Sequence, residues 1–365
     1  MNIIPINKYL TANDEALIIA GPCGAETREQ VLETAKQLSQ QPLTRPDGNG
    51  QVKVFRSGIW KPRTRPNSFE GVGEEGLKWL NEVKENYNLK TTVEVANAQH
   101  VELALKHGVD ILWIGARTTV NPFSVQEIAD VLKGVDVPVM VKNPIHSDLQ
   151  LWLGAIERIY NSGINKIIAV HRGFHFFGKS KYRNKPFWEI AIEFKTLLPQ
   201  LPIICDPSHI SGRRELIFSV SQKALNLGMS GLMIESHPHP DKALSDAQQQ
   251  LTPAKVIELL SQLSFPKTFS NNTKFTDKLN QFRSMIDEID DELINVLKKR
   301  ISVIEEIGEY KKEHNITVFQ LERWQEILRT RTQWGEKLGL SRNHIEKICQ
   351  LLHEESIRVQ NERRH

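Results

Sequence analysis

The chain has 365 residues, of which 39% are hydrophobic, and its formal net charge is +3. The length suits one large domain and a smaller one, and the small charge argues against nucleic-acid binding, which concentrates basic residues on one face. Three scattered cysteines, the lack of a signal peptide and the absence of an apolar run of roughly 18 residues indicate a cytoplasmic protein that does not enter a membrane.

Eight short apolar segments within the first 240 residues have the character of β-strands. They begin near residues 17, 52, 91, 111, 138, 166, 202 and 231, and successive starts are 20 to 39 residues apart. Each gap has room for a helix, and we expect helices at 28–40, 74–85, 98–106, 124–132 and, after the last strand, 253–262. Strands that alternate with helices predict a parallel sheet.

A charged or metal-binding side chain follows each of these strands. They are Cys23, Arg56, Lys61, Glu94, Arg117, Lys142, His171, Arg172, Asp206, His209 and Glu235. Functional groups after parallel strands are typical of a (β/α)8 barrel enzyme, whose active site is built from these loops. A doubly wound sheet is the alternative, but the first strand is not followed by a Gly-rich phosphate-binding loop. We therefore predict an α/β protein in which residues 1–262 form a (β/α)8 TIM barrel.

Four of the candidate side chains suit one divalent transition metal ion. They are Cys23, His209, Glu235 and Asp246. A buried thiol alone would be interpreted as structural, and a loop histidine alone would fit a structural role and a ligand role equally well. However, three of the four follow strands one, seven and eight, which are neighbours in a closed barrel. The mixed sulfur, nitrogen and oxygen set suits Mn²⁺, which we favour, and also Fe²⁺, Co²⁺ or Zn²⁺.

Six basic side chains are expected on the same rim. They are Arg56, Lys61, Arg63, Arg117, Lys142 and Arg172. Such a cluster is repulsive unless an anion neutralises it; Arg pairs with phosphate or carboxylate through two hydrogen bonds, and Lys acts as a point charge. The rim therefore predicts small phosphorylated and carboxylated substrates beside a metal that polarises a carbonyl.

The spacing of apolar residues changes in the last hundred residues. Residues 263–275 are polar and predict a linker, after which residues 276–365 form an all-helical domain. Apolar residues recur at spacings of three and four and predict one helix over 277–312. Such a helix is roughly 50 Å long and cannot cover its own apolar stripe, so we expect a homodimer through this domain. Two shorter helices are expected at 319–335 and 341–362, with Gly335 and Gly339 in the turn between them.

Cationic and polar residues occur within the apolar stripes of these helices. Arg300 and Lys311 are eleven residues apart and share a face. Arg283 lies about 80 to 100° around the helix, using 3.6 residues per turn, and one interpretation is that it reaches a neighbouring chain's site. Ser356 and Gln360 continue the stripe of the last helix. Buried cations need an anion or a carboxylate partner, so a bound anion is expected here too.

Seven segments resemble 3-deoxy-D-arabino-heptulosonate 7-phosphate (DAHP) synthase in its short form without large extra loops. They are GPC at 21–23, FRSGIWKPRTRPNSFEG at 55–71, IGAR at 114–117, VKNP at 141–144, HRG at 171–173, DPSH at 206–209 and ALSDAQQQL at 243–251. The resemblance covers residues 1–262 in unbroken order. The sister family that makes 3-deoxy-octulosonate 8-phosphate shares the barrel and is the alternative, but KPRT at 61–64 favours the heptulosonate enzyme.

This resemblance implies a role for each barrel residue. Cys23, His209, Glu235 and Asp246 would hold the metal. Arg117, Lys142 and Arg172 would bind phosphoenolpyruvate, with Arg56 and Lys61 near its carboxylate and reacting end. Arg63 and Thr64, helped by Arg213, would bind erythrose 4-phosphate. Glu94 is a candidate for orienting the attacking water or a cation, with a structural salt bridge as the alternative, and Asp206 is counted among the catalytic candidates.

Residues 279–360 resemble the all-helical chorismate mutase family, a dimer of intertwined three-helix chains. The implied dicarboxylate ligands are Arg300, Arg323 and Arg283 of the other protomer, and Lys311 and Gln360 would hydrogen-bond the ether oxygen. Gln320 and Ser356 are further candidates for binding chorismate or prephenate. This family commonly has acidic residues near the ring hydroxyl, whereas this chain has Gln320 and Trp324.

The two resemblances together predict a bifunctional shikimate-pathway enzyme. We expect the helical domain to mediate feedback inhibition by prephenate or chorismate. The alternative is that this domain only dimerises the enzyme or senses a ligand.

Overall fold

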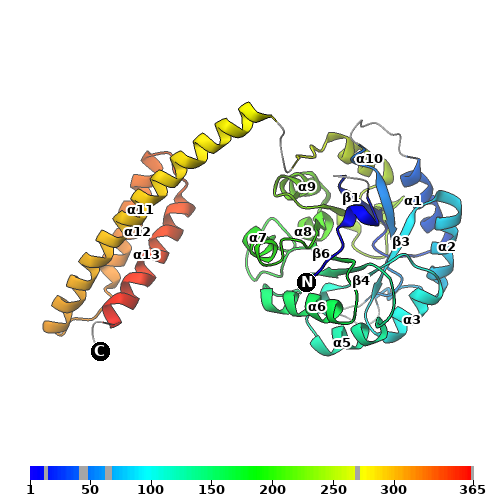
Figure 1. Cartoon of the computed structure of the whole chain (residues 1–365), viewed down its shortest axis with the longest axis horizontal. Helices are drawn as coiled ribbons and strands as arrows, with labels where there is room; N and C mark the ends of the chain where they lie inside the picture. The colour runs from blue at the N-terminus through cyan, green and yellow to red at the C-terminus, as the bar shows by residue number, and fades with distance from the viewer. Residues whose placement is uncertain (12–14, 41–47, 62–67, 268–271, 363–365) are drawn as a thin grey trace. The chain divides into compact units, whose positions relative to one another are not determined.

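The computed structural model describes residues 1–11, 15–40, 48–61, 68–267 and 272–362. The chain divides into two compact units, Met1–Thr268 and Phe269–His365 (Figure 1). Within the first unit, eight parallel strands close into a barrel because β1 pairs with both β2 and β8. The predicted (β/α)8 fold is therefore confirmed.

The strands follow one another around the barrel in chain order. Their bounds are β1 Leu17–Gly21, β2 Val52–Arg56, β3 Lys90–Val95, β4 Ile111–Ile114, β5 Val139–Lys142, β6 Ile167–His171, β7 Ile203–Cys205 and β8 Gly231–Glu235. The principal helices of this unit are α1 Arg28–Ser39, α2 Glu75–Tyr87, α3 Ala98–Lys106, α5 Pro122–Val131, α6 Leu149–Asn161, α7 Trp188–Leu197, α9 Ile217–Asn226 and α10 Pro253–Gln262. Two short helices, α4 Ala116–Thr119 and α8 Pro207–Ser211, directly follow β4 and β7.

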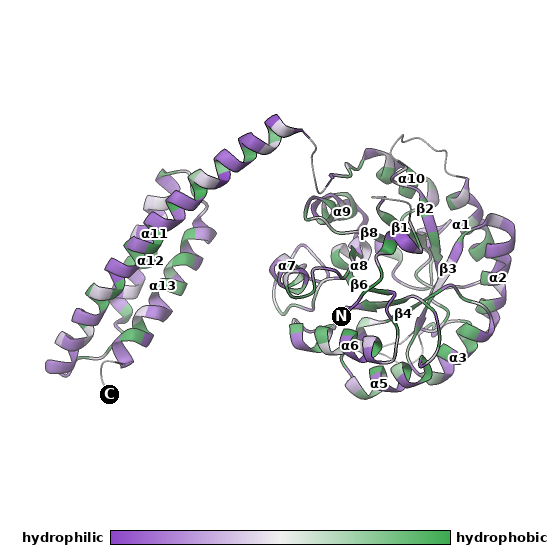
Figure 2. Cartoon of the chain, viewed as in Figure 1, coloured by the Kyte–Doolittle hydropathy of each residue, from purple (hydrophilic) through white to green (hydrophobic). Residues whose placement is uncertain are grey.

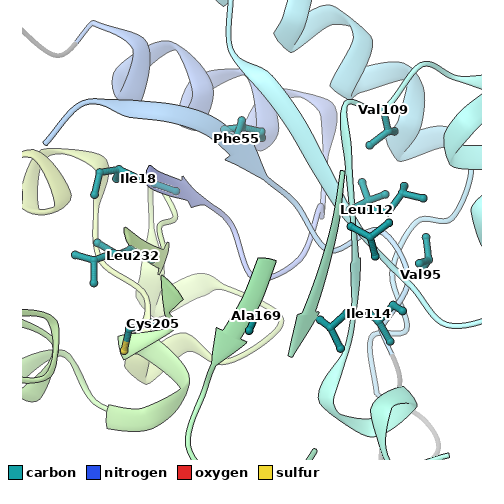
Figure 3. Packing of buried hydrophobic residues seen from close by; sticks show 14 of the residues in the cluster. Ile18, Phe55, Val95, Val109, Leu112, Ile114, Ala169, Cys205 and Leu232 are labelled. Atoms are coloured by element: carbon teal, nitrogen blue, oxygen red, sulfur yellow. The ribbon is translucent and has the colours of Figure 1, made fainter. Parts of the chain in front are cut away.

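Alternation along each strand divides the core into two layers, since successive side chains point to opposite faces. In β1, Ile18 and Ala20 face the surrounding helices, while Leu17 and Ile19 face the barrel interior. Figure 3 shows residues of the outer layer, among them Ile18 on β1 and Leu232 at the paired position on β8. Ile6 and Leu10 pack against the interior layer.

The second unit consists of three helices. They are α11 Thr273–Glu313, α12 Leu321–Lys337 and α13 Arg342–Glu362, and α13 packs against both of the others. Figure 2 shows hydrophobic residues recurring among hydrophilic ones along these helices. None of the described helices in either unit is long and apolar enough to cross a membrane.

The structure corrects two helix boundaries in this unit. α11 begins at Thr273, within the segment predicted to be linker, because the Asn272 side chain caps it by accepting a hydrogen bond from the Phe275 backbone N–H. Gly335 lies inside α12 and not in a turn. A Cβ at this position would lie 2.4 Å from Cγ1 of Ile345, so glycine allows α13 to approach α12 closely. The turn itself contains Gly339, at a φ of +79°.

Candidate active sites

The alternation that builds the barrel interior also places the charged side chains of the rim. Three charged residues each end a strand, two positions after an apolar residue of the barrel interior: Arg56, Lys142 and Glu235. They therefore point inward at the carboxyl-terminal end of the barrel. Arg172 and Asp206 follow β6 and β7 in the same phase. His171 is out of phase and lies outside this cluster, with its ring among those of Trp152, Phe174 and Trp188.

Three predicted metal ligands lie together on the rim. Ligand atoms of Cys23, Glu235 and Asp246 are all within 4.8 Å of one another. The fourth, His209, is adjacent: its Nε2 is 3.7 Å from Oε1 of Glu235 and 3.9 Å from Oδ2 of Asp246. Cys23 and Glu235 are fully buried, so these donors surround a point that is largely shielded from solvent.

Asp206 holds the imidazole of His209 in place. Its Oδ2 lies 2.7 Å from Nδ1 of His209, and its Oδ1 accepts a hydrogen bond from the His209 backbone N–H. Burial alone would raise the pKa of Asp206, but His209, Lys142 and Arg56 together hold it well below its ordinary value. An ionised carboxylate beside Nδ1 keeps the proton there and leaves Nε2 available as a ligand.

A chain of hydrogen bonds links the two carboxylates of the cluster. Gln249, which is buried, donates from Nε2 to Oε2 of Glu235 at 2.7 Å. Nη1 of Arg183 donates to Oε1 of Gln249 at 2.7 Å and to Oδ1 of Asp246 at 2.9 Å. Burial alone would raise the pKa of Asp246, but His209, Arg183 and Lys61 lower it. For Glu235, too, burial alone would raise the pKa, but His209 and Arg56 lower it, so both carboxylates are oriented and ionised.

Lys61 lies beside the thiol of the cluster. Its Nζ is 3.0 Å from Sγ of Cys23 and donates to the Cys23 carbonyl oxygen at 2.8 Å. Burial, followed by Glu235, raises the pKa of the Cys23 thiol to about 12. A divalent cation would offset both effects, because a coordinating thiol is deprotonated.

Two cationic side chains of the rim lie over the indole of Trp113. Cζ of Arg56 is 5.1 Å and Nζ of Lys142 is 5.7 Å from the centre of this ring. Lys142 donates to Oδ2 of Asp206 at 2.8 Å, and Nη2 of Arg56 donates to Oε1 of Glu235 at 3.0 Å. Nε and Nη1 of Arg56 are buried and form no hydrogen bond within the described part of the chain, so the guanidinium has donors left for a ligand.

Arg172 is held in place by two asparagines. Its Nη1 donates to Oδ1 of Asn184 at 2.9 Å, and its backbone N–H donates to Oδ1 of Asn143 at 2.7 Å. Burial, together with Arg183 and Arg117, lowers the pKa of Arg172 to about 10 against the opposing effect of Asp206. A bound anion would relieve this repulsion.

The carboxylate of Glu94 is held in place by Trp113 of β4 and by the space at Gly115, directly after this strand. Nε1 of Trp113 donates to Oε2 of Glu94 at 3.1 Å. A Cβ at Gly115 would lie only 1.9 Å from Oε1 of Glu94. The glycine of the IGAR segment therefore provides the space that this carboxylate occupies.

Of the remaining predicted barrel residues, Arg63 and Thr64 lie outside the described residues. Arg117 and Arg213 are described. Arg117 lies on α4. Arg213 lines a groove of about 960 Å³ that also contains Arg183 and Asp246, so this groove adjoins the metal-ligand cluster.

The helical unit contains a cavity of about 890 Å³ between its three helices. Most of the predicted mutase residues line it. They are Arg300, Lys311, Gln320, Arg323, Ser356 and Gln360, and Trp324 lies among them. Among the described residues that line this cavity, none is acidic, so its charge favours an anionic ligand.

The polar groups of this cavity are only partly satisfied. Burial lowers the pKa of Arg300, whose Nη1 is buried and has no hydrogen-bond partner among the described residues. Nζ of Lys311 donates to the carbonyl oxygen of Val318 at 2.8 Å. Nε2 of Gln360 donates to the carbonyl oxygen of Ser356 at 3.0 Å, and Oε1 is buried without a partner in residues 272–362 or elsewhere in the described chain. The amide of Gln360 would have to turn to donate to a ligand.

The structure does not bring Arg283 to this cavity. Arg283 is exposed on α11, and its Nη1 lies 3.4 Å from Oδ1 of Asn280. It is seventeen residues before Arg300, which is roughly 25 Å along a helix. Within one chain the two guanidinium groups cannot bind the same small molecule.

Several residues of the sites had no distinctive sequence signal. Arg183 and Asn184 lie in the long loop after β6, where neighbouring basic residues look equivalent in sequence. Gln249 is one of three consecutive glutamines in the quoted segment 243–251. His353 lines the helical cavity and occupies an ordinary helical position.

Comparisons with known proteins cover both units. The family model described as DAHP synthetase I family matches residues 3–268, and the model described as chorismate mutase type II matches residues 282–361. The chain is 35% identical over 261 residues to a phospho-2-dehydro-3-deoxyheptonate aldolase of Thermotoga maritima, covering 72% of each chain. It is 27% identical over 293 residues to a 2-dehydro-3-deoxyphosphooctonate aldolase of Bdellovibrio bacteriovorus, covering 74% of this chain and 97% of that one.

Solved structures agree with these matches. The crystal structure of the Thermotoga maritima phospho-2-dehydro-3-deoxyheptonate aldolase (DAHP synthase) superposes with a TM-score of 0.59 at 34% identity, covering 68% of each chain. A truncated form of the 3-deoxy-D-arabino-heptulosonate 7-phosphate synthase from that organism gives a TM-score of 0.57 at 33% identity, covering 68% of this chain and 86% of the other. This chain thus belongs to the DAHP synthetase I family and carries a C-terminal chorismate mutase type II domain, which makes it a bifunctional shikimate-pathway enzyme with DAHP synthase activity.

Proposed function

We propose that the barrel condenses phosphoenolpyruvate with erythrose 4-phosphate on the rim, with one divalent metal ion held by Cys23, His209, Glu235 and Asp246. The observation that carries this proposal is the convergence of three ligand atoms within 4.8 Å, beside the Nε2 of His209. The donor set suits Mn²⁺, and also Fe²⁺, Co²⁺ or Zn²⁺. When bound, such an ion would polarise the aldehyde carbonyl of erythrose 4-phosphate.

The basic residues divide the work of binding phosphoenolpyruvate. Arg172 and Arg117 would neutralise its phosphate, because Arg172 is already oriented by Asn184 and Asn143. Lys142 and Arg56 would bind near its carboxylate above Trp113. Charge neutralisation by prepositioned donors costs no reorganisation during the reaction.

The other reactant would enter from the groove beside the cluster. Arg213 lines that groove, and Arg63 and Thr64 are the further candidates for its phosphate. C3 of the enol would attack the aldehyde, and water would then attack C2 before phosphate leaves. Glu94, held by Trp113, would orient that water.

The helical unit would rearrange chorismate to prephenate. In its cavity, Arg300 and Arg323 would bind the two carboxylates of chorismate. Lys311 and Gln360 would donate hydrogen bonds to the ether oxygen as the C–O bond breaks. Donors held where charge develops are sufficient for this pericyclic reaction. Because the described residues that line the cavity include no acidic one, a second candidate is that the unit binds its ligand without turnover and only regulates the barrel.

A homodimer through α11 would complete this site. Apolar side chains on the amino-terminal half of α11, including Phe282 at 51% and Ile289 at 57% exposure, are uncovered in the single chain. Covering them with a second copy would bury this stripe and bring Arg283 of the partner chain to the cavity. Prephenate or chorismate bound there would then inhibit the barrel.

Substrate choice tests the barrel proposal most simply. The full-length protein should release phosphate from phosphoenolpyruvate when erythrose 4-phosphate and Mn²⁺ are present, and much less with arabinose 5-phosphate. Equal rates with both sugars would contradict the proposed specificity. For the helical unit, conversion of chorismate to prephenate separates a mutase from a ligand sensor.

A further inference from the structure

The helical cavity is rich in hydrogen-bond donors and has few acceptors. Four cationic side chains line it, from Arg300, Lys311, Arg323 and Arg331. Chorismate, the ligand proposed above, carries a ring hydroxyl in addition to its two carboxylates. That hydroxyl must give up its hydrogen bond to water when it enters, and an unsatisfied buried hydroxyl weakens binding.

Gln320 and Gln360 are the first residues to consider as its acceptor. Both line the cavity, but the proposed reaction requires Gln360 to turn its amide nitrogen toward the ether oxygen. Trp324, which lies among them, cannot accept at all, because the indole nitrogen is only a donor. Gln320 can accept through its amide oxygen, and an acceptor on another residue close to Trp324 would serve the same hydroxyl.

His353 on α13 has this location. Its ring is stacked on that of Trp324, with centroids 4.2 Å apart and planes inclined by 13°, and it meets the ring of Phe319 edge-on. Its Nε2 is buried and has no hydrogen-bond partner among the residues that the structure describes. The two aromatic neighbours restrict how the imidazole can turn, so its nitrogen is presented in a defined direction.

The surroundings of His353 favour its neutral form. Burial lowers its pKa, and Arg300 and Lys311 lower it further, against the opposing effect of Glu354. A neutral imidazole has one nitrogen that accepts a hydrogen bond, whereas an imidazolium has none. The cations that bind the carboxylates of the ligand thus also preserve the acceptor.

We propose that His353 is a substrate-binding residue of the mutase site, whose Nε2 accepts the hydrogen bond of the chorismate ring hydroxyl. In this proposal the stacked pair of His353 and Trp324 replaces an acidic acceptor: Trp324 positions the ring and His353 supplies the lone pair. The inference rests on the proposed function of the helical unit, since it assigns one contact to that ligand.

Two substitutions separate the lone pair from the ring. His353→Phe keeps a ring that stacks on Trp324 but has no acceptor, and His353→Gln places an amide oxygen near the position of Nε2. In the full-length protein, His353→Phe should lower kcat/KM for chorismate by about 10-fold or more, as expected when a buried hydroxyl loses its acceptor. His353→Gln should retain most of the activity. His344→Phe, at an exposed position on the same helix, is the matched control and should change nothing.

A substrate change completes the test. With an analogue of chorismate that lacks the ring hydroxyl, wild type and His353→Phe should turn over equally, because the contact is missing in both. The proposal is overturned if His353→Phe behaves as wild type on chorismate, or if its defect persists on the analogue.

Binding distinguishes this inference from the proposed mutase activity. If the wild type does not convert chorismate, calorimetric titration with chorismate should still show weaker binding to His353→Phe than to wild type, and the acceptor role would stand while the activity would not. If the wild type converts chorismate but His353→Phe binds and converts it equally well, the activity stands and the acceptor role fails. Failure of the wild type both to bind and to convert chorismate would overturn both.

Discussion

Nε2 of Gln249 lies 2.7 Å from Oε2 of Glu235 and connects this candidate metal ligand to Arg183. The contact holds the carboxylate in one orientation before any metal arrives. Partners that orient metal ligands typically contribute a factor of about 10 to 100 in metal affinity.

Gln249→Leu should therefore weaken Mn²⁺ binding to the full-length protein by roughly 10-fold or more. Isothermal titration of the chelator-stripped protein measures this directly. Gln248→Leu is the control, because its side chain is exposed one residue away. Equal Mn²⁺ affinities for Gln249→Leu and wild type would show that this contact does not prepare the site.

Gly115→Ala should reduce synthase activity while leaving metal affinity unchanged. The added methyl group would lie 1.9 Å from Oε1 of Glu94, so this carboxylate must move away from its position beside Trp113. We expect kcat to fall by about 10-fold or more, within the range of a lost catalytic contact. Gly154→Ala on α6, where a Cβ meets nothing within 4 Å, should be neutral. A Gly115→Ala enzyme with normal kcat would contradict the role proposed for Glu94.

His171 predicts an acid sensitivity of the barrel that is separate from catalysis. Burial lowers the pKa of His171 from 6.5 to about 3. Between these two pH values the unfolded chain binds a proton at this residue and the folded chain does not. The contribution of His171 to the free energy of unfolding is therefore fully present above pH 6.5 and is lost as the pH falls toward 3. The full effect is on the order of 5 kcal/mol.

Replacing this side chain should flatten that pH dependence. The melting temperature of the barrel should fall less between pH 7 and pH 4 in His171→Leu than in wild type, whereas His146→Leu, at an exposed position, should match wild type. Parallel curves for His171→Leu and wild type would mean that other groups dominate the acid response.

Arg283 and Arg300 provide a test of the proposed dimer. Each of Arg283→Ala and Arg300→Ala should lower mutase activity by on the order of 100-fold. Co-refolding the two variants should restore about a quarter of the wild-type activity, because half of the randomly formed dimers are mixed and each has one intact site. No recovery in the mixture would show that Arg283 does not complete the site of the partner chain. Lys299→Ala, at an exposed position on α11, is the control.

The barrel and its rim were largely predictable because a parallel strand has a strict period of two. Once Val54 and Met233 are interior residues, Arg56 and Glu235 must also point inward at the carboxyl end. The same rule places His171 outside. The closure of β1 on β8 then brings Cys23 near Glu235, as the predicted strand order implied.

Contacts made by loops and by close helix packing were not predictable in this way. Arg183 reaches Asp246 from a long loop whose path depends on tertiary packing, and nothing in the sequence distinguishes it from its basic neighbours. Glycine is common in turns, but Gly335 lies within α12, where Ile345 packs against it. The stacking of His353 on Trp324 joins two helices and has no local pattern.

Metal dependence with a defined stoichiometry tests the central claim most directly. The protein should lose phosphate release from phosphoenolpyruvate and erythrose 4-phosphate when it is stripped with a chelator. Titration with Mn²⁺ should restore the activity in proportion to one ion bound per chain, and Cys23→Ala should neither bind the ion tightly nor recover. Undiminished phosphate release by the stripped protein, or full recovery of Cys23→Ala, would contradict the assignment of these residues to one metal site.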